Sequence, residues 1–160
     1  MEIRTGTMED LAAIAAVEAL CFPPAEAASE ESFRRRLEKY PDHFWLLWDG
    51  DTLVSFVNGM VTVEPDLRDE MFDDASLHSG AGSWQMIFGV ATRPDYQRQG
   101  CAEKLLRRAI ADAGHQGRAG LVLTCKDYRI RYYAQFGFED EGVCPSSHGG
   151  AVWHQMRLTF

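Results

Sequence analysis

The sequence has no apolar run that approaches the ~20 residues needed to span a bilayer, so no membrane association is predicted. Its N-terminus lacks the basic region followed by an apolar one that marks a secretory signal peptide. These two absences predict a cytoplasmic protein. Internal repeats and low-complexity stretches are missing as well, so we expect residues 1–160 to form a single domain that buries its own core.

Paired cysteines are also missing. The four cysteines are Cys21, Cys101, Cys125 and Cys144, and none of them belongs to a C-x-x-C pair. The five histidines show no metal-ligand spacing. Structural zinc, disulfide bonds and a catalytic metal are therefore not expected, and free thiols fit a reducing compartment such as the cytoplasm.

Positive charge is scarce, because 16 Lys and Arg residues stand against 24 Asp and Glu residues, for a net charge of -8. Such a chain is a poor electrostatic match for nucleic acid, which is not predicted as a partner. The charge is uneven, since residues 64–74 are strongly acidic and residues 93–108 are rich in Arg and Lys. The basic segment predicts an anionic ligand and the acidic one a cationic ligand, although two solvated surfaces explain the pattern equally well.

The hydrophobic pattern alternates between helical and strand-like spacing. Helices are predicted at residues 7–21, 29–40, 102–113 and 128–135. Strands are predicted at residues 3–5, 44–48, 52–63, 84–92, 120–125 and 151–158, and a further one at Phe138. A loop or short helix is predicted at 64–74 and a flexible joint at 79–83. The hairpin at 44–63 is antiparallel, whereas strand 84–92, the next helix and strand 120–125 make a parallel crossover, which together predict a mixed α+β fold.

The junction between strand 84–92 and the following helix carries the clearest chemical signal. Its residues Gln97, Arg98, Gln99, Gly100, Cys101 and Ala102 fit the pattern Q/R-x-x-G-x-G/A. A helix N-terminus presents unpaired N–H groups and about half a positive charge, and small residues let a phosphate come close. The segment predicts a pyrophosphate-binding loop, with too few glycines for a Walker loop or a dinucleotide fingerprint.

With this loop in that setting, and with Tyr133 and Gly137-Phe138 further on, the chain resembles the GNAT N-acetyltransferase superfamily over nearly its whole length. The resemblance implies an α+β (mixed α/β) fold with a central, mostly antiparallel twisted sheet of about six or seven strands and about four helices. It also implies acetyl-CoA (acetyl-coenzyme A) as cosubstrate and direct attack by a primary amine in a ternary complex. The loop, the Tyr133 segment and the acidic insert look most like the arylalkylamine (serotonin) N-acetyltransferase branch.

The resemblance also assigns roles to residues. The coenzyme would be bound by Phe88, Gly89, Val90, Gln97, Arg98, Gln99, Gly100, Cys101, Ala102, Glu103 and Thr124. The N–H of Val90 would point at the thioester oxygen, a contact worth about 3 kcal/mol. Tyr133 matches the tyrosine that protonates the departing thiolate. Because a phenol is less acidic than a thiol, a hydrogen bond that strengthens as the thiolate forms describes this role better than full transfer.

The general base is not identified by the resemblance. The related branch places two histidines on the strand before the loop, where this sequence has Met86 and Phe88. Glu26, in the apolar loop after the first helix, is the candidate acid that attracts or deprotonates the amine, and an ordinary surface acid is the alternative. Phe22, Trp84 and Met86 would line an aromatic-accepting substrate pocket, unless they are simply core residues.

Two alternatives stay open at this point. An enzyme of the same fold would act on polyamines, lysines or protein N-termini. A coenzyme A-binding sensing module with little catalysis would account for the missing histidines, whereas an intact Tyr133 argues for an enzyme. A monomer or homodimer is expected.

Overall fold

The computed structural model describes residues 1–160, which form two compact units. The first unit comprises Met1–Gly59 and Gly89–Ala109, and the second comprises Met60–Phe88 and Ile110–Phe160. No helix is both long enough and apolar enough to cross a membrane.

The first unit contains a four-stranded antiparallel sheet in the order β1-β2-β3-β6. Its strands are β1 (Glu2–Thr5), β2 (Phe44–Asp49), β3 (Thr52–Asn58) and β6 (Gly89–Thr92). The turn between β2 and β3 places Gly50 at φ 58°, a left-handed conformation that favours glycine. The predicted hairpin is therefore confirmed.

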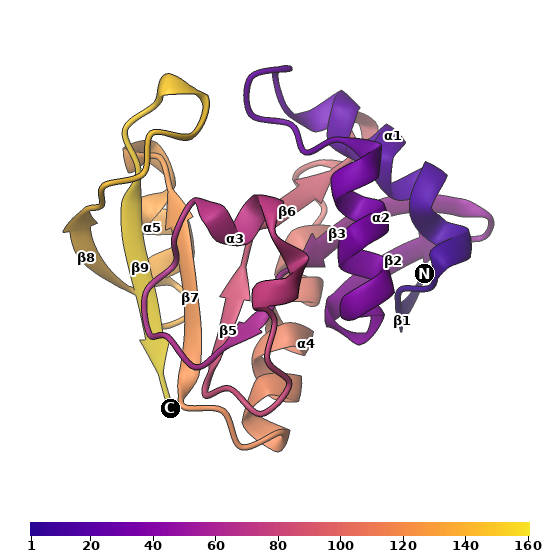
Figure 1. Ribbon diagram of the computed structural model, residues 1–160. Coiled ribbons are helices and arrows are strands. Elements are labelled where there is room, and N and C mark those ends of the chain that lie inside the picture. The colour runs from indigo at the N-terminus through magenta and orange to yellow at the C-terminus, as the bar shows by residue number, and fades with distance from the viewer. The chain divides into compact units, whose positions relative to one another are not determined.

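Helices α1 (Leu11–Cys21) and α2 (Glu30–Lys39) lie side by side over this sheet (Figure 1). A 3₁₀ turn at Met8–Asp10 leads into α1, and the carboxylate of Asp10 accepts the Thr7 N–H at 2.8 Å. Ser29 caps α2, because its Oγ accepts the Ser32 N–H at 3.1 Å. The helix start predicted at Ser29 is therefore confirmed, whereas the first predicted helix begins as a 3₁₀ turn at Met8 and becomes α-helical at Leu11.

Tyr40, at the end of α2, is fully buried and stacks on Phe44 with 6.1 Å between ring centroids. Burial raises the pKa of Tyr40 well above its ordinary value, and nearby Arg36 lowers it only in part. Because the pKa of Tyr40 is higher in the folded protein, the phenol of the unfolded chain ionises first as pH rises. The stability that this group contributes is therefore complete below the unfolded pKa of about 10 and is lost as pH rises above that value.

We therefore expect the free energy of unfolding to fall above about pH 10, by up to ~1.4 kcal/mol per pH unit for each such tyrosine. A Tyr40→Phe variant removes one ionisable group, so the slope of stability against pH becomes less steep by that amount. Urea unfolding at intervals between pH 8 and 11 measures the slope. A Tyr128→Phe variant, which changes an exposed ring, is the control, and equal slopes in the Tyr40 variant and the wild type would contradict the assignment.

The second unit contains a five-stranded mixed sheet in the order β4-β5-β7-β9-β8. Its strands are β4 (Val61–Thr62), β5 (Trp84–Ile87), β7 (Gly120–Cys125), β8 (Glu139–Val143) and β9 (His154–Thr159). Strands β5 and β7 are parallel and the other pairs are antiparallel. The predicted parallel crossover is therefore confirmed.

Three further helices complete the chain, α3 (Glu70–Asp73), α4 (Cys101–His115) and α5 (Ile130–Ala134). Helix α4 follows β6 in the chain and precedes β7. The boundary between the two units falls within this helix, after Ala109. Helix α5 packs on β8 and β9. Short 3₁₀ turns occupy Pro41–His43, Ala75–Leu77, Pro94–Tyr96, Asp127–Arg129 and His148–Gly150.

Two of the seven predicted strands are each broken in two, which gives the nine strands of the structure. The strand predicted at 52–63 ends at Asn58 and resumes as β4, and the one predicted at 84–92 is interrupted at Phe88. The two pieces of each strand belong to different sheets. At the second break Phe88 continues the apolar run, so the hydrophobic pattern does not reveal it, whereas Asn58-Gly59 at the first break is a turn signal that the prediction overlooked.

The flexible joint predicted at 79–83 is a closely packed turn. A Cβ atom on Gly82 would lie 2.4 Å from the backbone of Thr62, so only glycine fits there. Nη1 of Arg118 donates to the carbonyl oxygens of both Gly80 and Gly82 at 2.7 Å. The glycine at position 82 therefore lets two backbone segments approach closely, and it does not mark a mobile joint.

Candidate active site

The loop between β6 and α4 has an unusual backbone. Arg98 has φ 62° and is the sole non-glycine residue with a positive φ, and Gly100 has φ 78°. Left-handed residues within a turn direct successive N–H groups toward one concave side, which is how backbone amides form an anion-binding nest. The local conformation therefore agrees with the phosphate-binding loop predicted from the sequence.

The amides of this loop are available to a ligand. Lys104 N–H donates to the carbonyl of Gly100 at 3.1 Å, whereas the amides from Arg98 to Glu103 donate no backbone hydrogen bond. The residues from Gln97 to Gly100 are exposed. Since α4 is 15 residues long, its dipole adds partial positive charge at the same place. These residues fit a pyrophosphate.

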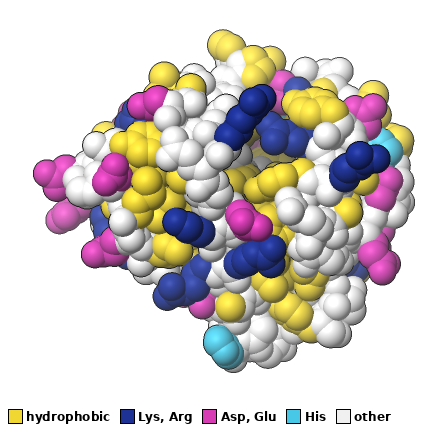
Figure 2. Space-filling model, turned by 180° about the vertical axis from the view of Figure 1, so that it is seen from behind, with side chains coloured by type: hydrophobic (Ala, Val, Ile, Leu, Met, Phe, Trp, Pro, Cys, Tyr) yellow, Lys and Arg dark blue, Asp and Glu magenta, His cyan; other side chains and the backbone are white.

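The loop side chains contribute less than its backbone. Cys101 is buried and its thiol donates to the carbonyl oxygen of Tyr96 at 3.7 Å, so this residue offers a ligand only its amide. The carboxylate of Glu103 pairs with Arg107 at 3.1 Å, which offsets its negative charge. Several Lys and Arg side chains, drawn in dark blue in Figure 2, are exposed on the face shown.

Gly89 and Val90 begin β6, directly after the break at Phe88. Strand β5 pairs with β7 as far as Ile87, and β6 pairs with β3 from Gly89 onward. The structure therefore releases strand pairing at Phe88, beside residues that are predicted to bind the coenzyme. A Cβ on Gly89 would lie 3.4 Å from Nδ2 of Asn58 and 3.9 Å from Oε1 of Glu18, so both side chains border this position.

A buried polar cluster next to Gly89 was missed by the sequence analysis. It consists of Glu18, Arg36 and Asn58, whose exposed fractions are 6%, 3% and 1%. Nη1 of Arg36 donates to Oδ1 of Asn58 at 2.9 Å, and Oε2 of Glu18 accepts the N–H of Ala28 at 2.9 Å. The sequence did contain a signal, because Glu18 stands at a position of the apolar stripe of its helix.

The contact between Glu18 and Ala28 holds the loop that carries two predicted site residues, Phe22 and Glu26. Both are half-buried, and the Glu26 N–H donates to the carbonyl of Pro23 at 2.9 Å, so Glu26 lies in a tight turn. The structure therefore brings Phe22 and Glu26 together on one ordered loop. The role of Glu26 as proton acceptor stays a prediction.

Tyr133 is half-buried on α5 in the second unit. Its ring meets Tyr132 edge-on at 5.1 Å and Phe138 at 6.2 Å between centroids. Burial raises the pKa of Tyr133 well above its ordinary value, with a smaller contribution from Tyr132. The phenol therefore stays protonated and can donate a hydrogen bond, whereas full transfer of its proton to a thiolate becomes still less favourable.

Four rings in the second unit form a continuous aromatic row, which consists of Phe88, Phe72, His148 and Trp153. Phe72 lies 4.6 Å from Phe88, and it stacks on His148 at 5.3 Å with an angle of 13° between the planes. His148 and Trp153 are 6.0 Å apart. Phe88 and Phe72 offer an apolar surface of the kind that an aromatic acceptor would contact.

Two of the residues predicted to line a substrate pocket take other positions. Met86 is fully buried in β5 and belongs to the core. The guanidinium of Arg157 lies over the ring of Trp84 at 4.6 Å, and Trp84 starts the strand whose other end leads to Phe88. Thr124, predicted to bind the coenzyme, is half-buried in β7 opposite Gln155. Phe88, also predicted to bind the coenzyme, belongs to the aromatic row.

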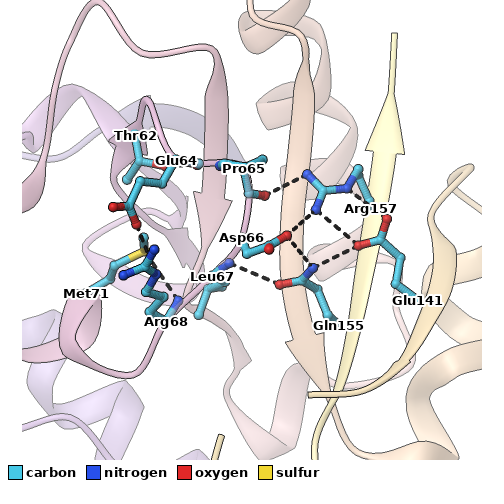
Figure 3. Close-up of polar contacts among 10 residues, drawn as sticks. All are labelled: Thr62, Glu64, Pro65, Asp66, Leu67, Arg68, Met71, Glu141, Gln155 and Arg157. Atoms are coloured by element: carbon cyan, nitrogen blue, oxygen red, sulfur yellow. Dashed lines mark hydrogen bonds and ion pairs between the residues drawn. The ribbon is translucent and has the colours of Figure 1, made fainter. Parts of the chain in front are cut away.

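The acidic insert is ordered by ion pairs and hydrogen bonds, as Figure 3 shows. Nη2 of Arg157 contacts Oδ1 of Asp66 at 2.7 Å, and its Nε contacts Oε2 of Glu141 at 2.9 Å. Nε2 of Gln155 donates to the same two carboxylates at 3.0 and 2.8 Å. The hydrogen bond from Arg157 lowers the pKa of Glu141. This network fastens the insert to β8 and β9.

Much of the insert's negative charge is therefore matched by cations of the protein itself. Nε of Arg68 pairs with Glu64 at 3.0 Å, and Asp69 accepts hydrogen bonds from Ser146 and Ser147. The acidic insert is thus less able to attract a cationic substrate than its sequence suggests.

Metal ligands and disulfides are not found in the structure. No group of three or more His, Cys, Asp or Glu side chains is placed to hold a metal ion, and all four cysteines are free. Burial raises the pKa of Cys125 to about 11, so this thiol is a poor nucleophile at neutral pH.

The family of the chain follows from its similarity to known proteins. The sequence model of the acetyltransferase (GNAT) family matches residues 11–138, so the chain belongs to the GNAT family. Serotonin N-acetyltransferase of Mesocricetus auratus is 26% identical over 109 residues, which are 68% of this chain and 51% of the relative. The chain thus spans about half the length of that relative.

Solved structures show the same fold. The loading GNATL domain of CurA from Lyngbya majuscula superposes with a TM-score of 0.87 at 18% identity, over 99% of this chain and 96% of the other. The GNAT-like decarboxylase GphF, in complex with isobutyryl-CoA, gives a TM-score of 0.83 at 20% identity over 99% of both chains. The predicted superfamily and the α+β fold are confirmed.

Proposed function

We propose that residues 1–160 form a single cytoplasmic catalytic domain that transfers an acetyl group from acetyl-CoA to a small arylalkylamine by direct attack in a ternary complex. The observation that carries the proposal is the α4 loop, whose amides from Arg98 to Glu103 make no backbone hydrogen bond. Membership of the GNAT family supports acetyl transfer. The isobutyryl-CoA bound to GphF supports an acyl-CoA cosubstrate on this fold.

In this reaction, separate groups of the chain would bind the coenzyme, stabilise the developing negative charge and assist the leaving thiolate. The α4 loop amides bind the pyrophosphate, and the N–H of Val90 donates to the thioester oxygen, where negative charge develops. Tyr133 donates a hydrogen bond to the departing thiolate. Acetyl-CoA supplies the activated acyl group. Because each contact to developing charge is stronger in the transition state than in the ground state, such contacts raise turnover rather than substrate affinity alone.

The aromatic row favours an arylalkylamine over a polyamine. Phe72 and Phe88 present an apolar surface, and contact with it would desolvate an alkylammonium and lower its pKa. This matters because freeing an alkylamine at pH 7 costs about 4 kcal/mol in water. The acidic insert would have favoured a polyamine, but Arg157 and Arg68 pair with several of its carboxylates. Similarity to serotonin N-acetyltransferase supports the same acceptor class.

The proposal is tested by amine-dependent release of free coenzyme A, detected with a thiol reagent at catalytic amounts of protein. The panel comprises phenethylamine, tryptamine, spermidine, a lysine peptide and a peptide with a free N-terminus. We expect the largest kcat/KM with the arylalkylamines. Preference for spermidine or a peptide would keep the reaction but contradict the acceptor class. Binding of acetyl-CoA without release by any amine would contradict the proposal and favour a sensing module.

A further inference from the structure

The acceptor amine must lose a proton, and the strand positions that carry histidines in the related branch hold Met86 and Phe88. Four of the five histidines lie in other settings. They are His43, buried in the first unit beside Asp42; His78, whose Nδ1 accepts the Val61 N–H; His115, exposed at the end of α4; and His154, which pairs with Asp140. The fifth histidine, His148, belongs to the aromatic row.

The position of His148 fits a proton acceptor beside an aromatic substrate. Its imidazole is half-buried and stacks on Phe72, which in turn contacts Phe88. Phe88 occupies one of the two positions where the related branch has a histidine. The fold therefore brings an imidazole to the neighbourhood of that position from a different element, the loop between β8 and β9.

The backbone of His148 is held on both sides, which fixes where its ring lies. Its carbonyl oxygen accepts Nε1–H of Trp153 at 2.8 Å, and its N–H donates to Oγ of Ser146 at 3.4 Å. Asp69 of the acidic insert accepts hydrogen bonds from Ser146 and from the Ser147 amide. The Arg157 network in turn fastens the insert. A catalytic base needs this kind of support.

We propose that His148 is the general base of the acetyl transfer, an inference that rests on the proposed function. His148 takes one proton from the alkylammonium, directly or through one water. The free amine nitrogen then forms a bond to the thioester carbonyl carbon, and the carbon–sulfur bond breaks. A second nitrogen-bound proton passes to the departing sulfur, which Tyr133 contacts by its hydrogen bond, and the third stays on the amide.

A His148→Gln variant tests the proposal with two acceptors, phenethylamine, which is mostly protonated at pH 7, and phenylhydrazine, which is mostly neutral. Since general base catalysis contributes on the order of 100-fold or more, we expect kcat/KM for phenethylamine at pH 7 to fall by about that factor. Phenylhydrazine needs no initial deprotonation, so its rate should fall far less. Between pH 7 and 9 the variant's rate with phenethylamine should rise about tenfold per pH unit, as the free amine does.

The matched control is His154→Gln, which changes a neighbouring histidine outside the aromatic row and should leave both rates near wild type. An equal loss with both acceptors, without recovery at high pH, would mean that His148 is structural and would overturn the inference alone. Unchanged rates in the His148→Gln variant would also overturn it. If the wild type acetylates neither acceptor while it binds acetyl-CoA, the proposed function fails and this inference with it.

Discussion

A Gly100→Ala variant is expected to bind coenzyme A on the order of 100-fold more weakly than the wild type, because a side chain on the loop would keep the pyrophosphate from its amides. Two charge-assisted hydrogen bonds lost at about 1.5 kcal/mol each give an effect of this size. The fold itself should tolerate the change. A Cβ at this position would meet Oε2 of Glu103 at 3.9 Å, which is an ordinary contact, and the left-handed φ costs about 1–2 kcal/mol.

A Gly50→Ala variant separates the two effects. Gly50 also has a left-handed φ, and a Cβ there would meet nothing within 4 Å. Both variants therefore carry a similar backbone penalty, which urea unfolding measures, but the hairpin turn has no predicted role in binding. Isothermal titration with coenzyme A should show a loss of affinity in the Gly100 variant alone. Equal affinities in the two variants would contradict the assignment of the α4 loop.

A Tyr133→Phe variant is expected to lower kcat by on the order of 100-fold while leaving the affinity for acetyl-CoA nearly unchanged, since the hydrogen bond to sulfur strengthens only as the thiolate forms. The phenol is suited to this role because burial raises the pKa of Tyr133, so it remains a donor at any pH at which the enzyme would work. Steady-state kinetics with the best amine of the panel, together with titration of the cosubstrate, checks both halves of the expectation.

The adjacent residue provides the control. Tyr132 lies on the same helix, and its ring meets that of Tyr133 edge-on at 5.1 Å. A Tyr132→Phe variant removes a hydroxyl from the same environment, yet it should keep kcat within a few-fold of wild type. If the Tyr132 variant loses turnover and the Tyr133 variant does not, the two roles are exchanged. If neither loses turnover, no tyrosine of α5 assists the leaving group.

The order of elements was predictable from the sequence wherever a local signal marks an element. Ser29 caps α2, and Gly50 forms the turn between β2 and β3. The α4 loop was found because a glycine and an alanine at a helix start have a distinctive spacing, and its backbone conformation agrees with the prediction. Signals of this kind depend on residues that are neighbours in the chain.

Features set by tertiary packing were not predictable. Arg36 is a charged residue that a helix normally exposes, and only the packed fold shows it buried with Asn58. Trp84 was expected in a pocket, but Arg157, which lies far along the chain, covers its ring. The same long-range network fastens the acidic insert, whose order the sequence left open.

The surroundings of Phe88 also could not be predicted from the sequence. Apolar residues continue through the break between β5 and β6, so the change of sheet partner leaves no trace in the hydrophobic pattern. His148 likewise gave no local signal, because its relation to Phe88 depends on Phe72 from the insert. Sequence reasoning could find the phosphate loop, but it could not assemble the aromatic row.

The central claim is that the chain moves the acetyl group of acetyl-CoA onto an amine nitrogen. The most direct test incubates the protein with isotopically labelled acetyl-CoA and phenethylamine, and quantifies the labelled amide by mass spectrometry together with free coenzyme A. The account predicts one labelled amide for each coenzyme A released, and little of either product without protein or without amine. Release of coenzyme A without labelled amide, or neither product despite bound acetyl-CoA, would contradict it.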